Sequence, residues 1–205
     1  MNIKAIVFDY GKVICFPPAD EVMDEIADLA GIEWKVIEPI YRKLRGEYDR
    51  GTFALAADFY RKILLELDCK ADDETLKKMG KLDLDSWKEI NPATVKLMED
   101  IKKAGYKLGI LSNMPFDFLD FIRNNISVIN LPHAALFSCE LGIIKPEKAI
   151  YQKLISVMDC RPQELVFFDD VLENVEKAKE LGVEARLWLD CEKARLDLAD
   201  LGVKL

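Results

Sequence analysis

The chain has 205 residues, of which 50% are hydrophobic and 32% are charged, a composition typical of a folded soluble protein rather than a disordered one. Its net charge of −8 at pH 7 would repel nucleic-acid backbones and anionic lipid, and no basic run offsets it, so we expect no nucleic-acid partner and no membrane partner. A chain of this length can hold one core domain and a modest second unit.

The cysteines are odd in number and scattered without a CxxC pair, which favours reduced thiols over a disulfide or zinc framework: Cys15, Cys69, Cys139, Cys160 and Cys191. No apolar stretch approaches the roughly 18 residues that cross a bilayer, and the N-terminal run does not resemble a leader. We therefore expect a cytoplasmic protein.

The first predicted element is a buried strand over Ile3–Phe8, a short β-branched and aromatic run that ends at Asp9. Residues 17–87 then show apolar residues at helical spacing only. Phe53–Leu67 contains one such stripe, and another ends before Gly31 and consists of Val22, Ile26, Leu29 and Ala30. Because this segment has no Gly/Ser-rich or low-complexity stretch, it resembles a lid more than a linker.

After the insertion, helices and strands alternate. Asn91-Pro92 supplies an N-cap and a first-turn proline for a helix that Gly105 closes. The run Tyr106–Leu111 predicts the next strand, and it ends at Ser112-Asn113.

The last third of the chain repeats this alternation. Pro146 opens a helix whose apolar residues Ile150, Leu154, Val157 and Met158 share one face. The elements that follow are a strand, a helix and a strand, over Leu165–Phe168, Glu173–Leu181 and Val183–Leu189.

Four strands that alternate with helices predict an α/β fold with a Rossmann-like, doubly wound parallel sheet and an inserted all-helical cap. We expect residues 1–16 and 88–205 to form the α/β core domain and residues 17–87 to form the cap. In such sheets ligands bind outside the carboxyl ends of the strands.

The residues predicted at those ends are polar: Asp9, Ser112, Asn113, Asp169 and Asp170, with Lys145 just before a helix. Carboxylates from two strands can hold Mg²⁺, a hard ion that prefers oxygen ligands. A lysine, a hydroxyl and backbone N–H groups can bind phosphate oxygens. The set therefore suits attack of Asp9 on a phosphoryl group, giving an aspartyl-phosphate that water hydrolyses.

Four segments, IVFDYGKVI, LGILSN, ELGIIKPEKAIY and LVFFDDVLENVEKAKELG, resemble in this order motifs one to four of the haloacid dehalogenase superfamily. The resemblance covers the whole predicted core, and the helical insertion is similar to the superfamily's first cap class. The first motif reads F-D-x-G-x-V, as in small sugar-phosphate phosphatases that include enzymes for α-D-glucose 1-phosphate. The resemblance implies a Mg²⁺-dependent phosphomonoester hydrolase of a small phosphorylated metabolite, and we expect a monomer or a weak homodimer.

Carried over by position, the resemblance implies that Asp9 is the nucleophile and that Lys145 bridges it to the phosphate. It implies Mg²⁺ ligands at Asp9, at the carbonyl of Gly11 and at Asp170, with Asp169 as a neighbouring or water-mediated ligand.

The resemblance also implies phosphate binding by Ser112 and Asn113, together with the loop that contains Tyr10 and Gly11. Asn174 would orient the metal shell.

The sequence departs from the resemblance at Gly11, where most phosphatases of the superfamily carry a second Asp that protonates the leaving group and activates water. One hypothesis is that the substrate has a good leaving group, as an anomeric phosphate does. Another is that the aspartyl-phosphate accumulates. The adjacent Lys12 either adds positive charge near the phosphate or is a solvated loop lysine.

A receiver-type signalling domain uses a similar set of residues, but there the acidic pair comes first in the chain and the acceptor Asp later, and the helical insertion has no place, so the order of parts argues against it. Two alternatives stay open. A 2-haloacid dehalogenase uses the same Asp without metal, usually with an aromatic residue at the position of Gly11. A catalytically impaired relative would bind phosphorylated metabolites without turning them over.

The aromatic residues of the insertion are expected mainly to pack its helices, with one or two facing the substrate: Trp34, Tyr41, Tyr48, Phe53, Phe59, Tyr60 and Trp87.

Overall fold

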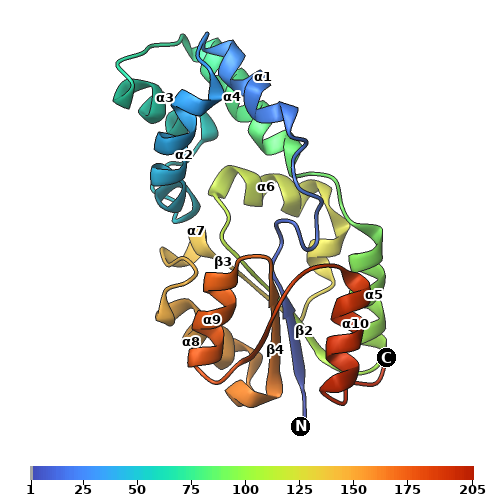
Figure 1. Ribbon diagram of the computed structural model, residues 1–205. Coiled ribbons are helices and arrows are strands. Elements are labelled where there is room, and N and C mark those ends of the chain that lie inside the picture. The colour runs from blue at the N-terminus through green and yellow to red at the C-terminus, as the bar shows by residue number, and fades with distance from the viewer. Residues whose placement is uncertain (1) are drawn as a thin grey trace.

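A five-stranded parallel sheet forms the centre of the larger part of the protein (Figure 1). The structure is a computed structural model that describes residues 2–205. In space the strands follow the order β3-β2-β1-β4-β5, and all neighbours run parallel. Their bounds are Ala5–Phe8 for β1, Lys107–Ser112 for β2, Ala134–Phe137 for β3, Leu165–Asp169 for β4 and Glu184–Leu187 for β5. The predicted doubly wound α/β fold is confirmed.

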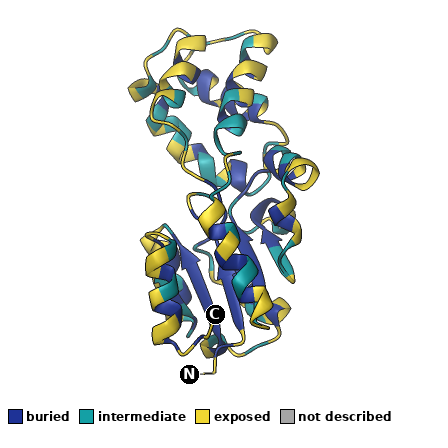
Figure 2. Ribbon diagram, turned by 90° about the vertical axis from the view of Figure 1, so that its right-hand side faces the viewer, coloured by how far each residue is buried: buried dark blue, intermediate teal, exposed yellow. Residues whose placement is uncertain are grey.

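Helices cover both faces of this sheet because successive strand residues point to opposite sides. In β1, Ile6 and Phe8 belong to the apolar cluster with α5, α6 and α10, whereas Ala5 and Val7 belong to the cluster with α8 and α9. Figure 2 shows the strands as the buried layer of the molecule. The helices of the core are α5 Pro92–Lys103, α6 Phe116–Asn125, α7 Ser138–Leu141, α8 Lys148–Met158, α9 Leu172–Glu180 and α10 Cys191–Asp200.

The edge strand β3 was not predicted, and its sequence explains why. It has only four residues, two of them alanines, which have low β-propensity and leave no β-branched pattern. The last strand is predicted over Val183–Leu189, but β5 covers only Glu184–Leu187. Two 3₁₀ turns at Ser127–Asn130 and Pro162–Glu164 complete the core.

The predicted helix starts hold in part. The side chain of Asn91 accepts a hydrogen bond of 3.0 Å from the backbone N–H of Ala93, so the predicted N-cap of α5 is confirmed. The helix expected to open at Pro146 begins two residues later, at Lys148. We expect Val157 and Leu29 on buried stripes, but they are 41% and 38% exposed. The buried face of α8 follows the four-residue spacing of Ile150, Leu154 and Met158, and Val157 lies beside it. Leu29 is the last residue of α1.

Four helices lie between β1 and α5, at the carboxyl end of the sheet (Figure 1). They share an apolar cluster of their own, with Phe59, Tyr60 and Ile63 fully buried in it. This helical content agrees with the expected cap, whereas the division into two units at residues 16/17 and 87/88 stays a prediction. The bounds are α1 Glu21–Leu29, α2 Trp34–Asp49, α3 Ala56–Glu66 and α4 Asp73–Ser86.

The two connections between cap and core run side by side. The backbone N–H of Phe16 donates to the carbonyl of Glu89 at 2.8 Å, and that of Asn91 donates to Ile14 at 2.9 Å. This short antiparallel pairing ties the cap to the core at one point, close to β1.

The cap also contacts the core through residues 48–56, which we call the docking segment. Its Gly51 has φ +89, and a Cβ there would stand 2.5 Å from the ring of Phe116, so only glycine fits this close approach. Arg50 pairs with Glu147 at 2.5 Å and donates to the carbonyl of Gly142 at 2.9 Å. The cap is therefore held at two separate places above the strand ends.

Two further expectations concern chemistry rather than topology. All five cysteines are free thiols, as predicted. Within residues 2–205, none of the helices combines the length and apolar character that a bilayer crossing requires.

Candidate active site

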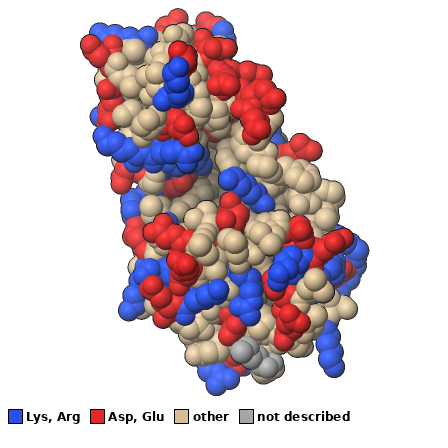
Figure 3. Space-filling view, in the orientation of Figure 1, with Lys and Arg blue, Asp and Glu red and all other residues tan. Residues whose placement is uncertain are grey.

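A cavity of about 200 Å³ lies between the carboxyl ends of the strands and the cap. Figure 3 shows a recess between the two parts of the molecule with basic side chains on its borders. The core supplies most of the predicted site residues to its wall: Asp9, Tyr10, Gly11, Lys12, Ser112, Asn113 and Asp170. The cap supplies Arg45, Tyr48, Asp83, Leu84 and Trp87.

Lys145 joins two carboxylates at the centre of the site. Its Nζ lies 2.8 Å from Oδ1 of Asp9 and 2.6 Å from Oδ2 of Asp169, and its side chain is buried. Burial alone would lower the pKa of Lys145, but the two carboxylates outweigh it and the pKa is raised. The lysine therefore keeps its positive charge beside Asp9.

The amide side chain of Asn113 positions Lys145. Its Nδ2 donates to the carbonyl of Lys145 at 3.0 Å and its Oδ1 accepts from the backbone N–H of Lys145 at 2.8 Å. A phosphate contact from Asn113 would thus come from its backbone. Ser112 is buried, and its hydroxyl makes one long contact of 3.4 Å with the carbonyl of Asn113, which leaves it able to donate to a ligand.

Asp169 is fully buried, and its oxygens are held by protein donors. Oδ1 accepts from the backbone N–H of Val171 at 2.8 Å, and Nδ2 of Asn174 donates to both oxygens at 3.0 and 3.1 Å. The N-cap residue of α9 is Val171, which makes no side-chain cap bond. Asp169 and Asp170 therefore lie before the N-cap position. Asn174 contacts Asp169 and lies in the first turn of this helix.

Asp9, Asp169 and Asp170 form a cluster in which each offers an oxygen within 4.8 Å of the others. Burial raises the pKa of Asp9 to about 7, with Lys145 lowering it and the carboxylate of Asp169 raising it further. Burial, followed by the charge of Asp169, also raises the pKa of Asp170. Crowded, partly buried carboxylates favour a bound cation, and an oxygen-only donor set suits Mg²⁺. Because the oxygens of Asp169 already have partners, Asp9 and Asp170 are the more available ligands.

The loop after β1 wraps around the carbonyl of Tyr10, which accepts from the backbone N–H groups of Val13, Ile14 and Cys15. The backbone N–H of Tyr10 donates to Oδ1 of Asp9 at 2.7 Å and so orients that carboxylate. The ring of Tyr10 lies in the core, edge-on to Phe118. Tyr10 therefore acts on the site through its backbone.

Gly11 and Lys12 complete this loop. A Cβ on Gly11 would stand 3.4 Å from Cζ3 of Trp87. Lys12 has φ +59, a conformation that non-glycine residues rarely adopt outside strained or functional loops. Its Nζ lies 3.6 Å from Oδ2 of Asp170, so its charge is close to the carboxylate cluster.

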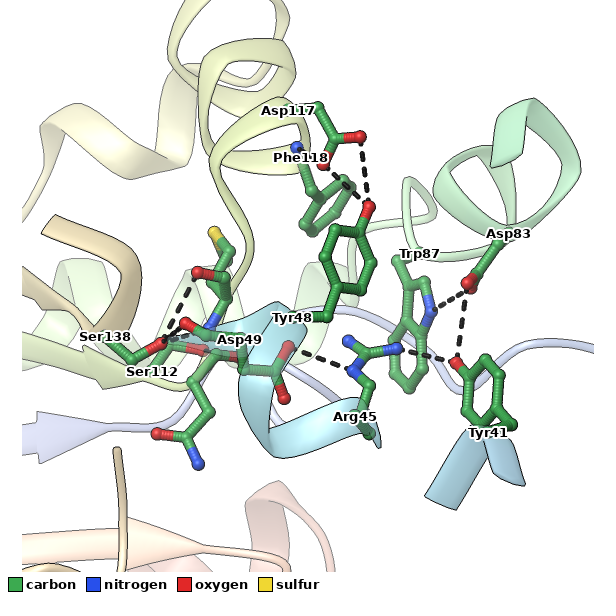
Figure 4. Close-up of polar contacts among 12 residues, drawn as sticks. Tyr41, Arg45, Tyr48, Asp49, Asp83, Trp87, Ser112, Asp117, Phe118 and Ser138 are labelled. Atoms are coloured by element: carbon green, nitrogen blue, oxygen red, sulfur yellow. Dashed lines mark hydrogen bonds and ion pairs between the residues drawn. The ribbon is translucent and has the colours of Figure 1, made fainter. Parts of the chain in front are cut away.

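Sequence reasoning missed the polar residues that the cap brings to the cavity (Figure 4). Arg45 and Asp83 line its wall, although neither follows a motif. Of the aromatic residues in the insertion, Tyr48 and Trp87 face the cavity. The one available signal is spacing, since Tyr41, Arg45 and Asp49 recur every four residues and share a helix face.

The cavity wall is joined to the core by hydrogen bonds of the docking segment. Tyr48 Oη donates to the carboxylate of Asp117, with distances of 2.8 and 3.0 Å to its two oxygens. The hydroxyl of Ser138 donates to the carbonyl of Asp49 at 2.5 Å and accepts from the backbone N–H of Met114 at 2.8 Å. Asp49 is the last residue of α2, and Met114 follows Asn113. The C-terminal end of α2 is therefore linked to the loop after β2.

A sequence model of the haloacid dehalogenase-like hydrolases matches residues 3–182. Phosphatase MT3486 of Mycobacterium tuberculosis is 26% identical over 199 residues, which cover 91% of this chain and 88% of that protein. (S)-2-haloacid dehalogenase 1 of a Pseudomonas species is 30% identical over 182 residues, which cover 80% and 75% of the two chains.

Other matches are partial or structural. Bifunctional epoxide hydrolase 2 of Sus scrofa is 30% identical over 128 residues, but the match spans 58% of this chain and only 22% of that protein. An enzyme of the same family from Bacteroides thetaiotaomicron, crystallised with magnesium and inorganic phosphate, superposes with a TM-score of 0.72. It is 21% identical, over 90% of this chain and 93% of that one. This likeness shows the shared fold.

Proposed function

Since the chain belongs to the haloacid dehalogenase-like hydrolases, we propose that it is a Mg²⁺-dependent phosphomonoester hydrolase that acts on a small phosphorylated metabolite through an aspartyl-phosphate. The observation that carries the proposal is the arrangement of Lys145 between Asp9 and Asp169, beside a third carboxylate at Asp170. This cluster brings together the proposed nucleophile Asp9, the buried ammonium group of Lys145 and an oxygen-rich site for a metal at one end of the sheet.

The metal would be held by Asp9, Asp170 and the carbonyl of Gly11, with Asp169 as a neighbouring or water-mediated ligand. When bound, Mg²⁺ would offset the repulsion between the carboxylates and an anionic substrate. Asn174, through its bonds to Asp169, would keep the acidic cluster oriented. A relative named as a phosphatase and a similar fold that binds magnesium with phosphate support this assignment.

The remaining residues would bind and orient the phosphoryl group. Lys145 and the hydroxyl of Ser112 would donate to its oxygens, with backbone N–H groups of Gly11 and Asn113. A carboxylate oxygen of Asp9 would then attack phosphorus in line, and the bond from phosphorus to the organic oxygen would break. Water would later attack the same phosphorus and release Asp9 and inorganic phosphate.

The proposed substrate class is a sugar 1-phosphate. The cavity of about 200 Å³ is smaller than the roughly 300–1,000 Å³ of typical ligand pockets, which suits a compact metabolite. The leaving oxygen of an anomeric phosphate belongs to a hemiacetal, which is more acidic than a simple alcohol. Such a substrate depends least on a proton donor at residue 11, where this chain has glycine.

Phosphate release from sugar 1-phosphates and sugar 6-phosphates, with Mg²⁺ and with EDTA, tests the proposal. We expect release that requires Mg²⁺, favours the 1-phosphates and disappears in Asp9→Asn. A preference for 6-phosphates would refute the substrate class. No Mg²⁺-dependent release from any phosphomonoester would refute the activity.

The 2-haloacid dehalogenase reaction is the second candidate, favoured by the 30% identity to such an enzyme. Gly11 in place of the usual aromatic residue, and the cluster of three carboxylates, count against it. Halide release from 2-chloropropionate that persists in EDTA would establish this alternative. A protein that binds sugar phosphates but releases neither phosphate nor halide would be the catalytically impaired relative.

A further inference from the structure

Arg45 reaches the cavity from the cap in a fixed orientation (Figure 4). Its Nε donates to Oδ1 of Asp49 at 2.9 Å and its Nη1 donates to the hydroxyl of Tyr41 at 2.7 Å. Its guanidinium carbon also lies 5.9 and 5.7 Å from the ring centroids of Tyr41 and Tyr48. Ion pair, hydrogen bond and aromatic faces together restrict this side chain.

The guanidinium still has donors to offer. Arginine carries five N–H groups, and within residues 2–205 the structure provides hydrogen-bond acceptors for Nε and Nη1 but for no N–H of Nη2. The side chain is 27% exposed. It lines both the catalytic cavity and a wider groove of about 630 Å³ that shares Lys12, Arg45 and Trp87 with it. Arg45 therefore lies where the two spaces meet.

The charge of the surrounding wall limits what these donors would bind. Asp49 is buried and paired with Arg45, which offsets its charge. Among the described cap residues, Arg45 and Asp83 are the charged ones on the cavity wall, and the carboxylate of Asp83 accepts from Tyr60 at 2.9 Å and from Nε1 of Trp87 at 3.4 Å. The wider groove adds three carboxylates and one further guanidinium from the cap, those of Asp20, Asp24, Glu38 and Arg42. With one guanidinium and two carboxylates close together, the cap provides directed donors rather than a net positive field. Hydroxyl oxygens of a neutral organic group suit it better than a second anionic group.

We propose that Arg45 is a specificity-determining residue that donates hydrogen bonds to hydroxyl oxygens of the substrate's organic group while the phosphate lies at Asp9. The indole of Trp87 would offer an apolar face to the same group. This inference rests on the proposed function and assigns the recognition of the polyhydroxylated part of a sugar phosphate to one cap side chain.

Calorimetric titration separates recognition from turnover. The parent protein is the Asp9→Asn variant with Mg²⁺ present. α-Glucose 1-phosphate and inorganic phosphate are titrated into this parent and into the double variants that also carry Arg45→Gln or Arg45→Lys. We expect both added changes to raise the dissociation constant of the sugar phosphate by about 10-fold to 100-fold, as loss of a charge-assisted hydrogen bond does. The dissociation constant of inorganic phosphate should stay unchanged. Arg45→Lys keeps the charge beside Asp49, so a melting curve close to that of the parent would exclude misfolding as the cause.

Lys43→Gln is the matched control. Lys43 lies two residues earlier on the same helix and pairs with Glu66, its side chain is 63% exposed, and it lines neither the cavity nor the groove. We expect it to alter neither affinity. An equal loss of affinity for both ligands in the Arg45 variants would overturn the inference, because Arg45 would then act on the phosphate or on the position of the cap. So would a parent that binds α-glucose 1-phosphate no more tightly than inorganic phosphate.

The same measurements distinguish this inference from the proposed function. If the unaltered protein hydrolyses no phosphomonoester, yet sugar-phosphate binding depends on Arg45, the proposed activity fails and the role of Arg45 stands. If hydrolysis is confirmed and the Arg45 variants bind both ligands as the parent does, the activity stands and the role of Arg45 is refuted.

Discussion

The indole of Trp87 lies beside Gly11, and a Cβ added to Gly11 would stand 3.4 Å from the ring, at ordinary contact distance. Trp87 directly follows α4, where the cap returns to the core, and its Nε1 lies 3.4 Å from Oδ1 of Asp83. A side chain longer than alanine at residue 11 would therefore have a cap residue as its neighbour. The glycine and the tryptophan fit each other.

This fit predicts that Gly11→Asp alone does not create an efficient acid/base. We expect the added carboxylate to crowd the indole of Trp87, and overpacking of this kind costs about 1–3 kcal/mol. We expect a lower free energy of unfolding in urea and slower phosphate release. Gly11→Ala, which adds only a methyl group at ordinary contact distance, serves as the control and should stay within about 0.5 kcal/mol.

Pairing the change with Trp87→Ala tests the reason. We expect Gly11→Asp to cost less stability when Trp87 is already alanine, with a coupling of at least about 0.5 kcal/mol between the two sites. Strict additivity of the two changes would show that the indole does not limit residue 11.

Lys145→Met should be among the most damaging single changes in the core. It leaves Asp9 and Asp169 buried without their cation, and breaking a buried ion pair from one side costs about 3–5 kcal/mol. We expect loss of activity and a lower urea midpoint. Lys12→Met, whose partner lies at 3.6 Å and whose side chain is 52% exposed, should change stability by less than about 1 kcal/mol. Similar losses in both variants would contradict this account.

The metal-free protein should lose stability as the pH rises. The pKa of Asp9 is raised from 3.8 to about 7, mainly by burial, so between these values the folded state holds a proton that the unfolded state has released. Stability from this group therefore falls by up to about 1.4 kcal/mol per pH unit in that window. Urea denaturation in EDTA at pH 5 to 8 measures it, with Asp9→Asn as the variant that lacks the effect.

Two outcomes decide this prediction. The stability of Asp9→Asn relative to the unaltered protein should increase from pH 5 to pH 7 and then level off, and Mg²⁺ should reduce the difference at pH 8. A difference that is constant across this range would mean that Asp9 ionises normally in the metal-free fold.

Ser138→Ala should loosen the cap. The change removes the donor to the carbonyl of Asp49 and leaves the buried N–H of Met114 without its acceptor, a loss worth about 1–3 kcal/mol. Because Met114 adjoins Asn113, we expect the Michaelis constant to increase along with the loss of stability. Ser86→Ala is the control for a lost hydroxyl, since among the described residues its hydroxyl bonds only to the carbonyl of Asp83 within the cap. An unchanged Michaelis constant in Ser138→Ala would show that the docking segment does not affect the site.

The sequence by itself determined the core fold and most of the core side of the site. Local patterns were sufficient because apolar runs and helix caps depend on neighbouring residues. Parallel strands bring their carboxyl ends to one edge, so Asp9, Ser112 and Asp170 could be expected on the same cavity, where the structure places them. The roles assigned to these residues remain predictions.

Only the tertiary structure decided how those residues are held and what faces them. The hydrogen bond from Asn113 to the backbone of Lys145 joins residues 32 positions apart. The contact between Trp87 and Gly11 depends on how the cap returns to the core. The position of Arg45 depends on the docking of α2 onto Ser138. Such contacts arise between elements distant in the chain, so no local periodicity encodes them. The edge strand β3 was hidden for a local reason, since its four residues include two alanines.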